Sequence, residues 1–171
     1  ASLVMALAVY DALAEFIDPG LLQLKWPNDC LVKGAKICGI LAESCGQKPL
    51  ALALGCGINV LAAPASMPYP VCCVADYHDR VTVTGVFDAL RENAELWLQQ
   101  WNDGAAFERI RDAWIRRTCP LGTRLLVRAH GGEVQGAFAG LAEDGALLLD
   151  VGGEKLQRIY EGDVGLAGES A

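Results

Sequence analysis

Three short strings in this chain place lysine, asparagine and aspartate side chains where they could bind an anion. They are Lys25-Trp26-Pro27-Asn28-Asp29, then Lys36-Ile37-Cys38-Gly39-Ile40-Leu41, and finally Gly55-Cys56-Gly57-Ile58-Asn59. Ammonium and amide N–H groups stabilise negative charge as it develops on a carboxylate or phosphate. A neighbouring carboxylate can hold the magnesium ion that accompanies nucleotide phosphates. No string is specific alone, because a strand lysine is usually solvated and Asn-Asp after proline usually forms a turn. The combination indicates a site for anionic ligands.

The residues around these strings show patterns that would place them on neighbouring strands. Apolar and polar side chains alternate in the first segment, and turn residues separate the following apolar runs. The predicted strands are residues 21–26, 30–32, 36–43 and 50–60, with turns at Lys33-Gly34 and at residues 44–49. The three strings would then lie on adjacent strands of one sheet.

The last of these strands has two very different faces. One face carries Leu52, Leu54, Cys56, Ile58 and Val60, and the other carries Ala51, Ala53, Gly55, Gly57 and Asn59. The second face has almost no side chains before its terminal amide, and glycine in a strand often marks close approach by a ligand or by another backbone. Two interpretations stay open: a floor on which a flat ligand lies, or tight packing against a helix.

Helical patterns flank the predicted sheet. Residues 2–17 carry an apolar stripe and should form an amphipathic helix that ends before Pro19-Gly20. A second and a third helix follow residues 62–80, which we interpret as a loop. The predicted core stripes of the three helices are Leu3, Leu7, Tyr10, Ala14 and Ile17; Phe87, Leu90, Ala94, Trp97 and Trp101; and Phe107, Ile110 and Trp114.

The pattern changes near residue 120, where short alternating runs separated by glycine-rich turns begin. The four predicted strands are residues 124–129, 134–141, 146–151 and 155–160. A meander this short is unstable as an exposed flat sheet, so we expect a small barrel packed on the larger part. The sequence thus predicts an α+β protein with domains at residues 1–119 and 120–171.

Composition excludes several classes of function. The chain has 171 residues, is 53% hydrophobic and carries a net charge of −7, which argues for a packed core and against general nucleic-acid binding. Its seven cysteines show no C-x-x-C pair and suit structural thiols in a reducing cytoplasm. We expect neither a secretory segment nor a membrane span.

Taken together, the three strings resemble the biotin–protein ligase family, whose members activate biotin with ATP and attach it to a lysine of a carrier protein. By that resemblance, Lys36 contacts the biotin carboxyl group and the phosphate and is the catalytic residue. ATP would be bound by Lys25, Asn28, Asp29, Lys36 and Asn59, and biotin by Lys36, Gly39, Leu41, Gly55 and Gly57. Asp29 would also hold Mg²⁺. Alternation alone does not place Lys36 and Leu41 on one face, so that part of the pocket depends on the resemblance.

The resemblance extends to the C-terminal strings Phe138-Ala139-Gly140-Leu141, Gly145-Ala146-Leu147-Leu148-Leu149 and Gly162-Asp163-Val164, which look like the SH3-like barrel of these ligases. It implies a mixed β-sheet with packed helices, of the class II synthetase type, followed by that barrel. The implied partner is a biotin carboxyl carrier protein, of acetyl-CoA carboxylase or another biotin-dependent carboxylase. A homodimer is one possible assembly.

One feature of the family is absent from these 171 residues: the upstream Gly/Arg-rich loop that closes over biotin and adenylate, with its adjoining strands. We therefore expect an N-terminally incomplete piece of a ligase, nearly inactive by itself. Two other hypotheses stay open. The first is a lipoate or octanoyl ligase of the same superfamily, and the second is a non-catalytic module that binds biotin or a nucleotide.

Overall fold

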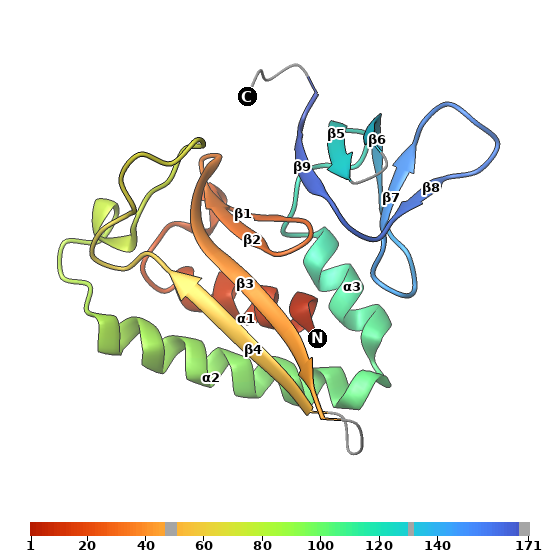
Figure 1. The fold of residues 1–171 in the computed structure, drawn as a ribbon. Helices are drawn as coiled ribbons and strands as arrows, with labels where there is room; N and C mark the ends of the chain where they lie inside the picture. The colour runs from red at the N-terminus through yellow and green to blue at the C-terminus, as the bar shows by residue number, and fades with distance from the viewer. Residues whose placement is uncertain (47–50, 130–131, 168–171) are drawn as a thin grey trace.

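The structure, a computed structural model, describes residues 1–46, 51–129 and 132–167. Two antiparallel sheets and three α-helices make up these residues (Figure 1). The first sheet has the order β1-β2-β3-β4, with β1 Leu22–Lys25, β2 Asp29–Val32, β3 Ala35–Cys45 and β4 Ala51–Ile58. One isolated parallel bridge, between Lys36 and Val71, extends it. The four strands confirm the predicted pattern with ends shifted by a few residues, and the predicted turn at 44–49 falls partly outside the described residues.

The helices cover one face of the first sheet (Figure 1). Helix α1 contacts all four strands, α2 packs along α1, and α3 contacts both of these helices and β6. Their bounds are α1 Ser2–Leu13, α2 Val83–Trp101 and α3 Phe107–Ile115, and short 3₁₀ turns occupy Pro19–Leu21, Val74–Asp76 and Asn102–Gly104. None of the helices in these described parts is long and apolar enough to cross a membrane.

Two helix predictions need correction. Helix α1 ends at Leu13, short of the predicted residue 17, and it is buried on most of its circumference, with Val4, Ala8 and Val9 as covered as Leu7. It lies between the sheet and α2, so apolar side chains are buried on both of these sides. On α2 the predicted core residue Phe87 is 61% exposed, because the buried stripe runs through Val86, Ala89 and Trp97.

The second sheet has the order β8-β7-β6-β5-β9. Its strands are β5 Arg124–Ala129, β6 Gly132–Leu141, β7 Leu147–Asp150, β8 Gln157–Ile159 and β9 Asp163–Leu166. Four of them confirm the predicted meander, whereas β9 was not predicted. β9 pairs with β5, and no pairing of the described residues joins β8 to β9, so this sheet is not closed into a complete barrel.

Candidate functional site

Most of the candidate residues lie in two neighbouring rows across the first sheet. Lys25 pairs with Asp29 on β2, Asp29 pairs with Gly39 on β3, and Gly39 pairs with Gly57 on β4. Residues directly opposite each other in a sheet share one face. The sheet therefore gathers a lysine, an aspartate and two glycines in a single row on the face that points away from α1. The next row contains Leu41 and Gly55, again directly opposite each other.

A β-bulge brings Lys36 onto this same face. On β2, Cys30 pairs with Cys38, whereas the following residue, Leu31, pairs with Lys36. Strand β3 therefore has one extra residue, Ile37, between these two pairs. Ile37 and Cys38 are both buried, at 0% and 1% exposure, where regular alternation would bury only one of them. An extra residue reverses the alternation on one side of the bulge. Lys36 consequently faces the same way as Gly39, which the regular pattern did not predict.

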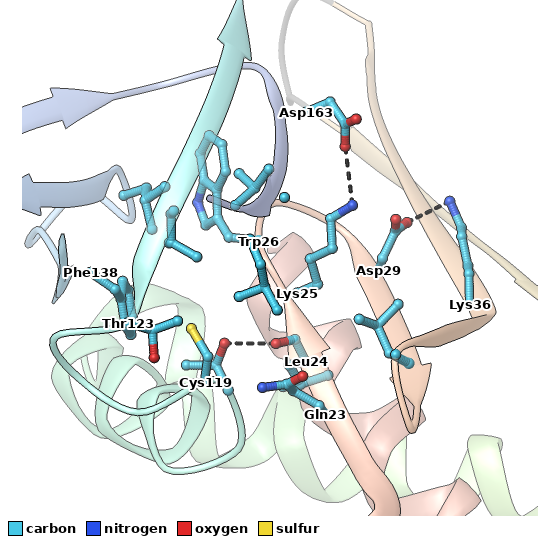
Figure 2. A pocket seen from close by; sticks show the side chains of 18 of the residues that line it. Gln23, Leu24, Lys25, Trp26, Asp29, Lys36, Cys119, Thr123, Phe138 and Asp163 are labelled. Atoms are coloured by element: carbon cyan, nitrogen blue, oxygen red, sulfur yellow. Dashed lines mark hydrogen bonds and ion pairs between the residues drawn. The ribbon is translucent and has the colours of Figure 1, made fainter. Parts of the chain in front are cut away.

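Lys36 and Asp29 form an ion pair at the centre of the row (Figure 2). The Lys36 Nζ lies 2.6 Å from the Asp29 Oδ1, and the side chains are 28% and 12% exposed. Gly39 makes room for this pair, because a Cβ at that position would lie 3.3 Å from Lys36 Nζ and 3.7 Å from Asp29 Oδ1. The arrangement offers a partly exposed ammonium group, held by one carboxylate, to an incoming anion.

Lys25 connects this row to the second sheet. Its Nζ lies 3.1 Å from the Oδ1 of Asp163, at the start of β9 (Figure 2). Between the two sheets lies a cavity of about 540 Å³, and the charged residues Lys25, Asp29, Lys36 and Asp163 line it together with apolar side chains. Cys119 also lines the cavity. Burial raises the pKa of the Cys119 thiol, so this thiol is a poor nucleophile.

The two candidate asparagines support the backbone beside the row. The side-chain amide of Asn28 donates to the Ile40 carbonyl at 2.9 Å, and the backbone carbonyl of Asn28 accepts from the Ile40 N–H at 2.8 Å. Asn59 donates its amide to the Cys72 carbonyl at 3.0 Å. Neither asparagine lines the cavity. These bonds hold β3 and residues near 72 in place, and direct nucleotide contacts by Asn28 and Asn59 stay predictions.

The flat face of β4 is open. Ala51, Ala53, Gly55 and Gly57 are exposed, and a Cβ at either glycine would lie at least 3.9 Å from the neighbouring strand β3. Leu41 is 59% exposed beside them. The helices pack on the opposite face, so the interpretation of this face as tight helix packing is wrong for the described residues. Binding of a flat ligand on this face stays a prediction.

Sequence reasoning missed two residues of this site. Tyr69 places its ring centroid 5.7 Å from Lys36 Nζ, although it comes from the segment interpreted only as a loop. Asp163 was part of a C-terminal string with no role assigned. No periodic pattern in the sequence links either residue to the first sheet, so only the tertiary structure could show that they lie in this site.

The donor atoms around Asp29 suit one kind of magnesium binding and not another. Among the described residues, no three His, Cys, Asp or Glu side chains come together as in a resident metal site. A magnesium ion that arrives with a nucleotide needs only one or two carboxylates, because phosphates and water complete its shell. The single Asp29 carboxylate fits this second kind of binding.

Comparisons with known proteins agree with the architecture. Residues 1–59 match the family model "Biotin/lipoate A/B protein ligase family" and residues 121–166 match "Biotin protein ligase C terminal domain". The chain is 37% identical over 158 residues to a biotin–[acetyl-CoA-carboxylase] ligase of Paracoccus denitrificans and 34% identical over 170 residues to one of Mycobacterium tuberculosis. These alignments cover 86% and 95% of this chain but only 65% and 60% of the relatives' lengths.

A solved structure shows the same fold. The biotin protein ligase of Aquifex aeolicus, in complex with biotin and ATP, is similar with a TM-score of 0.80 at 22% identity. The match covers 97% of this chain and 71% of that one. The similarity therefore includes both sheets and the three helices.

Proposed function

Because this chain belongs to the biotin protein ligase family, we propose that it forms part of an enzyme that joins biotin to protein. The enzyme would convert biotin and MgATP into biotinyl-5′-AMP and pyrophosphate. It would then transfer the biotinyl group to the ε-amine of a lysine in a biotin carboxyl carrier protein. We also propose a boundary near residue 120, with residues 1–119 belonging to the catalytic domain and 120–171 to the C-terminal domain.

The observation that carries this proposal is the placement of Lys36 by the bulge, beside Asp29 and above Gly39. In the first reaction, a biotin carboxylate oxygen attacks the α-phosphorus of ATP. Two anions must meet, and negative charge accumulates on the phosphoryl oxygens. A fixed ammonium group that faces both reactants lowers the energy of that arrangement more than water does. Lys36 is the cation that the sheet presents for this role.

The remaining residues have roles that follow from their places in the rows. Lys25, in the cavity between the sheets, would bind the phosphates that leave as pyrophosphate. Leu41, Gly55 and Gly57 would form the floor beneath biotin, because this part of the sheet is flat and open. Asp29 would hold the magnesium ion of MgATP, which neutralises phosphate charge when bound. Asn28 and Asn59 would bind nucleotide with the amide oxygens.

The decisive experiment compares two lysine variants of the full-length protein. Lys36→Ala should lower the single-turnover rate of biotinyl-AMP formation by about 10²–10³-fold, the usual scale for one lost transition-state charge contact. The matched control is Lys33→Ala, which removes an exposed lysine from the adjacent β2–β3 turn and should leave the rate unchanged. An unchanged rate in Lys36→Ala would refute the proposal.

The same assay separates the alternatives. The first matching family model covers lipoate ligases as well as biotin ligases, so lipoate should be supplied as a competing substrate. Formation of lipoyl-AMP in preference to biotinyl-AMP would favour the lipoate hypothesis. Binding of biotin without any acyl-adenylate in the presence of MgATP would favour a non-catalytic module.

A further inference from the structure

The segment Tyr69–Cys72 is bonded to the backbone of Lys36 itself. Lys36 donates its N–H to the Pro70 carbonyl at 2.9 Å, and Cys72 donates its N–H to the Lys36 carbonyl at 3.1 Å. This pair of bonds makes the parallel bridge between Lys36 and Val71. Beyond the end of β4, the segment therefore takes the place of a neighbouring strand along β3.

Two further contacts fix the same segment. The Asn59 amide donates to the Cys72 carbonyl at 3.0 Å, and the Cys72 thiol lies 3.7 Å from the Ala35 carbonyl as a weak donor. Residues on both sides of the bridge are thus held to β3 and to the end of β4. A side chain carried at residue 69 has a defined position relative to Lys36 for this reason.

The ring of Tyr69 is that side chain. Its centroid lies 5.7 Å from Lys36 Nζ, within the range of a cation–π contact, and the residue lines the cavity while remaining 43% exposed. The Lys36 ammonium group therefore lies near both the Asp29 carboxylate, at 2.6 Å, and this ring.

The two groups near Lys36 differ in net charge, because Asp29 is a carboxylate and the ring of Tyr69 is neutral. A second carboxylate would restrain Lys36 but would also cancel its charge and repel an anionic substrate. An aromatic face attracts the ammonium group through its quadrupole without carrying net charge. Lysine has a flexible four-carbon chain, and restraint before binding lowers the entropy lost when an anion is engaged.

We propose that Tyr69 is a positioning residue for Lys36, holding its ammonium group over the open face of the sheet with Asp29. The inference rests on the proposed role of Lys36. It gives residues 62–80, which carried no assigned role, a function in the activation step. Tyr69 acts through its ring, so the phenol hydroxyl is dispensable.

The test is a double-mutant cycle in the full-length protein. Tyr69→Leu should lower the single-turnover rate of biotinyl-AMP formation by about threefold to thirtyfold, the range of a cation–π contact. Tyr69→Phe retains the ring and should stay within about twofold of the unaltered protein. In the Lys36→Ala background, Tyr69→Leu should cause no further loss, because residues that act through one contact are not additive. Tyr160→Leu, which removes a 66% exposed tyrosine from the second sheet region, is the matched control and should leave the rate unchanged.

A second readout tests positioning without catalysis. The rate at which acetic anhydride modifies Lys36, measured by mass spectrometry, should rise by about threefold in Tyr69→Leu and stay unchanged in Tyr69→Phe, since the ring restrains and covers the amine. Equal losses of adenylation rate from Tyr69→Leu in both backgrounds would show that the ring acts on the substrate directly and would overturn the inference. Full activity of Tyr69→Leu beside an inactive Lys36→Ala would overturn it while leaving the proposed function intact.

Discussion

At the scale of single residues, the site depends on the missing side chain of a glycine as well as on two charged side chains. Gly39 faces Lys36 and Asp29, and its missing side chain is the space in which their ion pair forms. Asn28 is predicted as a nucleotide ligand, and in the structure its amide donates to the backbone carbonyl of Ile40 on β3. Gly39 and Asn28 therefore support the strand and the space in which the Lys36 ammonium group lies.

Gly39→Ala tests this account. The new methyl group would lie 3.3 Å from the Cε and Nζ of Lys36, so the end of the lysine side chain must shift by a few tenths of an ångström. A misplacement of about 1 Å can cost about 10²-fold in rate, so we expect this smaller shift to lower the rate of biotinyl-AMP formation by about twofold to tenfold. Gly153→Ala, in an exposed turn where the nearest neighbouring atom is 4.0 Å away, is the control. A Gly39→Ala protein as active as this control would show that the pair is not confined there.

At the scale of elements, the bulge in β3 is the decisive feature. It allows Ile37 and Cys38 to face the core together and turns Lys36 to the open side. The inner face beneath it holds thiols that are kept neutral. Burial raises the pKa of the Cys30 thiol from 9.0 to about 12, and it raises the pKa of Cys56 to about 11. These cysteines pack as small apolar groups, which confirms their predicted structural role.

The raised pKa of Cys30 makes stability dependent on alkaline pH. Above pH 9 the unfolded chain releases this proton while the folded protein keeps it until about pH 12. The folded state then binds more protons, so the free energy of unfolding falls as pH rises between these values. Cys30→Ala should make that decline shallower by at most about 1.4 kcal/mol per pH unit.

Urea unfolding at pH 8 to 11, with reductant present, measures this slope. Cys56→Ala provides an internal comparison, because its pKa of about 11 confines its contribution to a narrower interval. Identical slopes for Cys30→Ala and the unaltered protein would contradict the assignment of a proton to Cys30 across this range.

At the scale of the whole molecule, two contacts join the end of β1 to the second sheet region. Lys25 pairs with Asp163, and the Trp26 indole N–H donates to the Gly145 carbonyl at 3.2 Å. The cavity lies between the two sheets and receives residues from both. The C-terminal region is therefore part of the wall of the proposed phosphate site.

Asp163→Asn tests this connection. The ion pair is exposed on its Asp163 side, at 74%, so its loss should change the free energy of unfolding by less than about 1 kcal/mol. Removing a negative charge beside Lys25 should strengthen binding of anionic ATP by about twofold to fivefold at low salt, and less at high salt. Titration of the full-length protein with ATP at low and high salt measures the affinity, and urea unfolding measures the free energy of unfolding. Glu154→Gln, an equal charge change in an exposed turn, is the control, and equal affinities in the two variants would contradict the prediction.

The sequence by itself determined the three helices and the strands other than β9, because alternation, helical stripes and turn residues are local signals. It also identified Lys25, Asp29, Gly39 and Gly57 as related residues, and regular antiparallel pairing then places them in one row. The side on which Lys36 lies was decided only by the tertiary structure, because a bulge arises from pairing between strands. Tyr69 and Asp163 reach the site through backbone bonds and a pairing of β9 that join segments far apart in sequence. Such contacts produce no periodic pattern in the sequence, so only the folded structure could show them.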